Sequence, residues 1–159
     1  MKRRQLGDVR VDLRIDEIAE AAKKALDPGM FAAARVVKNE AASNAQGLSQ
    51  GITDRMYAIS RSDVEGRPHK TARRAVKAQG GAVVSSSDPK THLFELGVEP
   101  HVIQPRRGKA LRLDNGRWVK GRVQHPGMAA RPFLRPALDS TKREATAAAL
   151  KVIRTEMQK

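Results

Sequence analysis

Histidines and clustered carboxylates are the side chains of this sequence best suited to metal or acid–base chemistry. The histidines are His69, His92, His101 and His125, and the clustered acids are Asp8, Asp12, Asp16, Glu17 and Glu20. A metal-dependent nuclease needs several such groups around one cation. The histidines lack the spacing of a zinc site, and a metal role would require His92, His101 and His125 to meet in space. The acids alternate as a solvated face does, so we expect no metal, no cofactor and no enzyme.

A basic segment, "QPRRGKALRLDNGRWVKGRVQ", covers residues 104–124 and sets seven cations against one acid, Asp114. The cations are Arg106, Arg107, Lys109, Arg112, Arg117, Lys120 and Arg122. Phosphates neutralised by such side chains release counterions, which makes binding salt-dependent. Aromatic residues are only 3% of the chain, and Trp118 alone is not a stacking platform. The segment is therefore suited to non-specific DNA contact or to an acidic protein surface, and both alternatives stay open.

Composition agrees with an interaction protein. The chain has 159 residues, which predicts one domain over 1–159 with 104–124 as a basic hairpin extension. Its 31 basic and 17 acidic side chains give a net charge of +14, which implies a polyanion or an oppositely charged protein ring as neighbour. Cysteine is absent, so disulfides and thiolate metal sites are excluded and assembly in the cytoplasm fits. No apolar stretch follows the basic start or is long enough for a membrane span.

The first half of the sequence predicts a strand and then helices. Residues 8–15 alternate apolar and charged side chains, the period of a half-buried strand, and residues 16–26 are helix formers. Asp27 is a candidate N-cap of a second helix, with Pro28 at its first position. The apolar face of this helix is expected at Met30, Ala34, Val37, Ala41 and Ala45. Gly47 and Gly51 predict a bend before Tyr57.

The second half predicts short extended pieces before a long final helix. We expect helix or loop within residues 60–81, with a strand as the alternative, and a strand over 82–87. "THLFELGV" and "HVIQP" are expected to be extended, and Asn115-Gly116 predicts a hairpin. A helix over 136–157 has an apolar stripe at Leu138, Ala145, Ala149, Val152 and Ile153. The predicted class is α+β: a small, mostly antiparallel sheet with a basic hairpin, packed against N-terminal helices and one long C-terminal helix.

Three pieces in order carry a family resemblance: "HLFELGV" from His92, "HPGMAARPFLRPAL" from His125, and the amphipathic C-terminal helix. In this order they resemble the neck and tail-completion proteins of tailed bacteriophages. Glu95, Leu96 and Gly97 match that family's Glu-aromatic-Gly element, although Leu96 stands at the aromatic position. Residues 132–137, "PFLRPA", match its second element without a change. "NAQGLSQGITDRMYAIS" departs from the family's usual segment after the second helix.

The resemblance implies a non-enzymatic structural protein of the virion, assembled in the host cytoplasm into the head–tail connector as a tail-completion or tail-terminator-type ring. It implies sixfold or twelvefold self-association, contact with head-closure or connector proteins and with tail-terminator or tail-tube proteins, and non-specific contact with channel DNA. The alternative from composition alone is a free, basic, sequence-tolerant nucleic-acid-binding protein. Ring formation separates the two hypotheses.

The segment before the last helix is the predicted contact with neighbouring subunits. Its residues are Pro132, Phe133, Leu134, Arg135 and Pro136, together with Glu95 and Gly97. Pro136 is expected to fix the first helical turn and to keep Arg135 out of the helical region, so that Phe133 and Leu134 form an extended lead-in. Two interpretations stay open, since Phe133 and Leu134 either fill their own subunit's core or pack against the next subunit.

Overall fold

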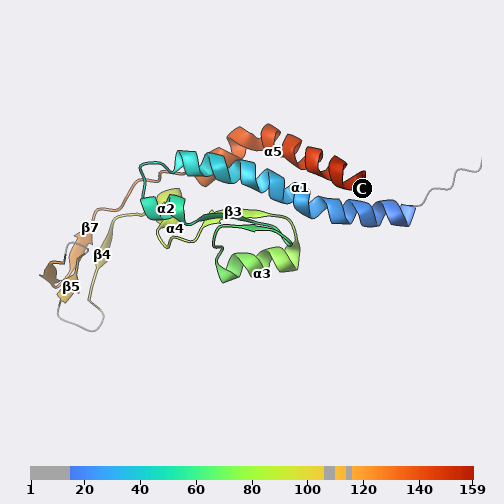
Figure 1. The fold of residues 1–159 in the computed structure, drawn as a ribbon. Coiled ribbons are helices and arrows are strands. Elements are labelled where there is room, and N and C mark those ends of the chain that lie inside the picture. The colour runs from blue at the N-terminus through green and yellow to red at the C-terminus, as the bar shows by residue number, and fades with distance from the viewer. Residues whose placement is uncertain (1–14, 106–109, 114–115) are drawn as a thin grey trace, which may run out of the picture.

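The computed structural model describes residues 15–105, 110–113 and 116–159, and it has the predicted α+β class (Figure 1). In chain order the elements are α1 (Ile15–Asn44), α2 (Gln50–Asp54), β1 (Met56–Ile59), β2 (Val64–Glu65), α3 (Lys70–Gln79), β3 (Val83–Ser86), α4 (Thr91–Leu96), β4 (His101–Ile103), β5 (Ala110–Arg112), β6 (Trp118–Lys120), β7 (Val123–His125) and α5 (Leu134–Met157). Helices α1 and α5 pack on one face of the central sheet, and α3 covers the other face. No helix in the described part of the chain is long and apolar enough to cross a membrane.

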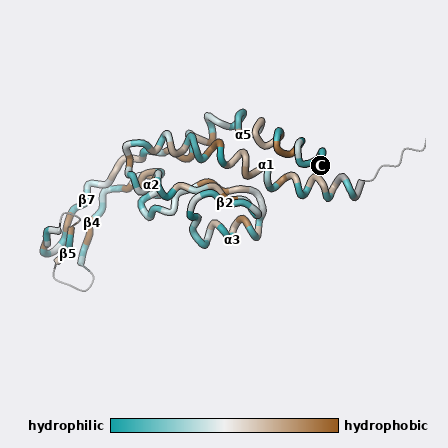
Figure 2. Tube along the Cα trace, viewed as in Figure 1, coloured by the Kyte–Doolittle hydropathy of each residue, from teal (hydrophilic) through white to brown (hydrophobic). Residues whose placement is uncertain are grey.

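The central sheet has three antiparallel strands in the order β2-β1-β3. Strand β1 is buried along its whole length because helices cover both of its faces. Met56 points into the cluster with α1 and α5, whereas Tyr57 and Ile59 pack with Val76 of α3. A strand covered on both sides must be apolar at every position, and "MYAI" is. Figure 2 shows the hydrophobic residues of this layer between the two helical layers.

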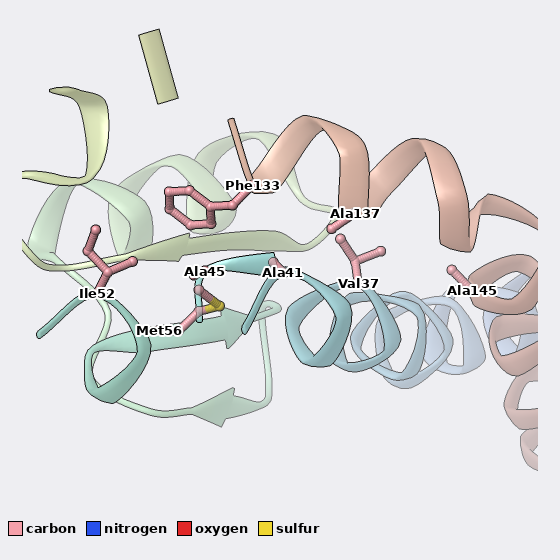
Figure 3. Close-up of a cluster of buried hydrophobic side chains, with 8 residues drawn as sticks. All are labelled: Val37, Ala41, Ala45, Ile52, Met56, Phe133, Ala137 and Ala145. Atoms are coloured by element: carbon pink, nitrogen blue, oxygen red, sulfur yellow. The ribbon is translucent and has the colours of Figure 1, made fainter. Parts of the chain in front are cut away.

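The main core joins α1, α5 and the sheet. It consists of Val37, Ala41, Ala45, Ile52, Met56, Phe133, Ala137 and Ala145 (Figure 3). Alanines face one another between α1 and α5, so the two antiparallel helices approach closely. The two helices are close at Gly29 of α1, because a Cβ there would lie 2.6 Å from Cγ1 of Ile153. The long helices are therefore held together by small residues rather than by large apolar ones.

The structure corrects the expected break at Asp27 and Pro28. Helix α1 continues through Pro28, although an interior proline removes one hydrogen bond and crowds the preceding turn at a cost of about 3 kcal/mol. Packing against α5 offsets this cost, since Ala25 is fully buried and Gly29 contacts α5. Asp27 is not an N-cap here, because its carboxylate accepts hydrogen bonds from the turn after β1.

Other predictions for the first half are confirmed where the structure describes them. Ala34, Val37, Ala41 and Ala45 are buried along one face of α1, while Met30 is 40% exposed. Helix α1 ends at Asn44, and a turn with Gly47 at φ 77° leads to α2, which is the expected bend. The α3 helix and the β3 strand are also confirmed. The strand expected over 8–15 lies outside the described residues, except for residue 15, which begins α1.

The segment "THLFELGV" is a helix over Thr91–Leu96, so the extended conformation expected there was wrong. The turn before it starts the helix. The Asp88 carboxylate accepts a hydrogen bond from the Lys90 N–H at 2.8 Å, and the Asp88 carbonyl accepts one from the Thr91 hydroxyl at 2.7 Å. Gly97, at φ 76°, ends the helix after six residues. Six residues are too few for apolar spacing to separate helix from strand.

The described residues between Val98 and Met128 form an arm that projects from the body beside α2 and α4 (Figure 1). Strand β4 pairs antiparallel with β7, and β5 pairs antiparallel with β6. The expected hairpin is confirmed, with Leu111 opposite Val119 and Arg112 opposite Trp118. No described residue of the arm is fully buried. The arm therefore has two ribbons and no core of its own.

Candidate functional site at the base of the arm

Glu95 joins α4 to the first turn of α5. Its carboxylate accepts hydrogen bonds from the backbone N–H groups of Phe133 at 2.9 Å, Leu134 at 3.0 Å and Arg135 at 3.1 Å. The N-terminus of α5 has no side-chain cap from its own N-cap residue, Phe133. A negative charge at a helix N-terminus is favourable because of the free N–H groups and the helix dipole. Glu95 is thus the cap of α5, supplied from about 40 residues earlier in the chain.

Two glycines let the two ends of the arm cross closely beside this cap. Val98 and Met128 exchange backbone hydrogen bonds of 2.8 Å each. A Cβ at Gly97 would lie 2.8 Å from the backbone nitrogen of Ala130, and one at Gly127 would lie 2.5 Å from the carbonyl oxygen of Val98. Both glycines also have positive φ, so no other residue fits without strain. This crossing holds the base of the arm closed.

The crossing brings together the sequence segments on which the resemblance rests. The Arg131 N–H donates to the carbonyl oxygen of Phe94 at 2.7 Å, next to the bonds of Glu95. Glu95 and Gly97 therefore do lie beside the segment of residues 132–136, as their assignment to one interface required. Whether a second subunit contacts them stays a prediction.

The structure places the predicted contact residues in different environments. Phe133 is fully buried in its own chain's core, which is the first of the two interpretations left open. Leu134 is half-buried at the edge of that core, while Pro132 and Pro136 are exposed. The expected extended lead-in is wrong, because Leu134 and Arg135 are already helical. Three bonds from Glu95 outweigh the preference of Arg135, the residue before a proline, for extended backbone.

The basic residues of the arm that the structure describes are Arg112, Arg117, Lys120 and Arg122, and all four are exposed. Arg106, Arg107 and Lys109 lie outside the described residues. Trp118 is 67% exposed among these cations, and Val102 on β4 is 46% exposed. An exposed indole beside cations adds an apolar contact to a surface that otherwise acts through charge.

The four histidines lie in different parts of the structure. His101 and His125 lie opposite each other on β4 and β7 with their rings stacked 5.0 Å apart, whereas His69 and His92 lie on the body. Nδ1 of His125 accepts a hydrogen bond from the Gly127 N–H, so it is engaged within the arm. Among residues 15–105, 110–113 and 116–159, no three metal-ligating side chains gather.

An apolar groove opens between α1, β3 and α5, and the sequence did not predict it. Its volume is about 670 Å³. Met30, Leu138 and Leu150 line it and are 40%, 54% and 46% exposed. Alanines also line it, and their small side chains leave space that larger ones would fill. Leu138, Ala145 and Ala149 of the predicted α5 stripe line this groove, and Leu150, which is outside that stripe, lines it too.

Two carboxylates fix α1 to the sheet beneath it. Burial raises the pKa of Asp27, but hydrogen bonds from Ser62, Arg61 and Ser60 outweigh burial and hold that pKa below its ordinary value. A hydrogen bond from Lys38 lowers the pKa of Glu65, and the charges of Lys38 and Arg35 add to the effect. Arg35 lies 2.9 Å from Glu65. These contacts position the body on which the arm and the groove are built.

Comparison with protein-family models, with curated proteins and with solved structures found no match to this chain. The functional conclusion therefore depends on the chain's own residues and geometry.

Proposed function

We propose that this chain is a non-enzymatic structural protein of a tailed bacteriophage, a ring-forming component of the head–tail connector. The observation that carries the proposal is the unit at the base of the arm. "HLFELGV" and "HPGMAARPFLRPAL", the two segments that resemble tail-completion proteins, are joined there by the cap from Glu95 and by the Val98–Met128 crossing. The two segments are separated in the sequence, and they contact each other in the fold.

The arm supports self-association. A two-stranded ribbon is marginally stable by itself in water. The arm has two such ribbons and exposes Val102 and Trp118. A neighbouring subunit that covers this apolar surface would stabilise it.

The groove supports a ring rather than a symmetric dimer. Exposed large apolar residues occur on two different surfaces, Val102 and Trp118 on the arm and Met30, Leu138 and Leu150 in the groove. Contact between two different surfaces of identical subunits is heterologous, and heterologous contacts produce closed rings when the rotation closes. We propose that the arm of one copy lies against the body of the next, with the exposed arginines and lysines facing channel DNA or acidic faces of adjacent rings.

Leu138→Glu tests this arrangement. Leu138 is exposed, so the substitution should not unfold the monomer, but it places a charge in the groove. The matched control is Ala147→Glu, an exposed position of α5 that does not line the groove. We expect negative-stain electron microscopy and sedimentation velocity to show closed rings for the wild type and Ala147→Glu, and monomers for Leu138→Glu. Equal assembly of the two variants would contradict the role of the groove.

The second candidate is a free, sequence-tolerant nucleic-acid-binding protein, favoured by the exposed cations of the arm. It predicts a monomer or dimer at every protein concentration, with DNA affinity that falls steeply with salt. A wild-type chain that never forms rings would support this function and exclude the connector.

A further inference from the structure

Helix α3 carries a second basic surface, separate from the arm. Lys70, Arg73, Arg74 and Lys77, here called the α3 face, are all exposed. They are spaced at i, i+3, i+4 and i+7, which places them on one side of the helix. Arg61 lies beside this face, since Arg61, Arg73 and Lys77 line the same surface hollow. The opposite side of α3 is occupied, because Ala72 and Val76 pack against Tyr57 and Ile59 of β1.

The charge of the α3 face is not balanced within the described part of the chain. No side-chain hydrogen bond or ion pair there engages its four cations, and the sequence has no acid between Glu65 and Asp88. Glu65 is held by Lys38 and Arg35 of α1. Like charges at i,i+3 and i,i+4 weaken a helix, and the first turn has no acid to favour the dipole. Local helix stability therefore does not explain this pattern, whereas an anionic partner does.

The chemistry of the face selects the kind of partner. Besides its cations, α3 exposes only Thr71, Ala78 and Gln79, so the helix has no aromatic or large apolar anchor; Val64 of β2, 43% exposed, is an apolar residue beside it in the hollow. Protein interfaces depend on such anchors at their centre, whereas a phosphate backbone is bound mainly through charge. The apolar side of α3 is packed on the sheet, so the helix cannot bury that side in a bilayer. Four cations span about 10 Å of helix, and a duplex presents one negative charge per about 1.7 Å of its axis.

We propose that the α3 face binds the phosphate backbone of double-stranded nucleic acid without reading its sequence. The face lies on the side of the sheet away from α1 and α5, so it is separate from the groove (Figure 1). A duplex held there would contact the body of the protein rather than the arm.

The test is the salt dependence of duplex binding, measured by fluorescence anisotropy with the full chain and a random-sequence DNA. Arg73→Gln with Arg74→Gln removes two charges and keeps good helix formers. The matched control, Arg143→Gln with Lys151→Gln, removes two exposed charges from α5. The association constant K falls as salt rises, and each phosphate contact contributes about 0.9 to the steepness of log K against log salt. We therefore expect the α3 double variant to reduce the steepness by about 1.8 and to weaken binding roughly 60-fold near 0.1 M salt. Lys77→Gln alone should reduce the steepness of log K against log salt by about 0.9.

Two results would overturn the proposal. If the α3 variant and the α5 control show the same reduction in salt dependence and in affinity, DNA binding depends on the net charge of the protein, and the α3 face is not a specific site. If poly-glutamate binds the wild type as tightly as the duplex does, and loses as much affinity in the α3 variant, the partner is an acidic protein surface. Circular dichroism checks that each variant keeps the helix content of the wild type.

Discussion

Replacing Glu95 by alanine should destabilise the protein more than any other exposed or half-buried charge change at the base of the arm. The substitution removes the acceptor of three N–H bonds, from Phe133, Leu134 and Arg135. Loss of an N-cap costs about 0.5 to 2 kcal/mol, and loss of a partly buried charge at a helix N-terminus costs up to about 2 kcal/mol. Water can reach Arg135 but not buried Phe133, so we expect a total of about 2 to 3 kcal/mol.

Urea denaturation at neutral pH measures this loss. With a slope of about 2 kcal/mol per molar, the midpoint should fall by about 1 to 1.5 M. Glu95→Gln keeps one acceptor oxygen and loses the charge, so it should lose about half as much free energy of unfolding. The control is Glu99→Ala, an exposed acid four residues after Glu95 and beyond the end of α4, which should change stability by less than about 0.5 kcal/mol. Equal midpoints for Glu95→Ala and Glu99→Ala would refute the cap.

The remaining predictions concern the crossing, the core and acid stability. Gly97→Ala should lower the free energy of unfolding by about 1 to 3 kcal/mol through backbone strain, and by more through the clash of its Cβ with the backbone. The control is Gly47→Ala, which also has positive φ but has open space around its Cβ. Similar losses of stability in the two variants would exclude the clash. Phe133→Ala should lower the free energy of unfolding by about 3 to 5 kcal/mol, and a wild-type thermal midpoint would contradict full burial. Because the pKa values of Asp27 and Glu65 are lowered by folding, their stabilisation is present above the ordinary values of 3.8 and 4.5 and is lost as pH falls through the lower folded values. Asp27→Asn should therefore show a smaller drop in urea midpoint between neutral and acid pH than the wild type, and an unchanged drop would contradict this linkage.

Periodic patterns in the sequence predicted the elements that tertiary contacts reinforce. The face of α1 from Ala34 to Ala45 and the Asn115-Gly116 hairpin signal are local features, and neither needs knowledge of a distant partner. The fold class followed from them.

Two of the errors, at Pro28 and at Arg135, share one cause, which is that long-range contacts decide local structure. Pro28 would start a helix in isolation, but packing of Gly29 against α5 carries α1 through it. Arg135 would be extended before a proline, but Glu95 completes the helix around it. Glu95 was chosen as a contact residue from the resemblance, whereas its capping role depends on a pairing that no local spacing reveals. The groove likewise depends on the packing of α1, β3 and α5, which are distant in the sequence.

The closed base of the arm separates the packed body of the protein from the arm. Val98 and Met128 pair through their backbones, and Glu95 holds the chain where it returns to the body. The packing of the core therefore does not depend on the length of the segment between Val98 and Met128. Doubling the length of a closed loop adds only about 0.6 kcal/mol of entropy cost. A longer, shorter or unrelated hairpin grafted between these two residues would leave the body intact. An arm of different length or sequence would therefore change the surface that this chain offers to partners without changing its scaffold.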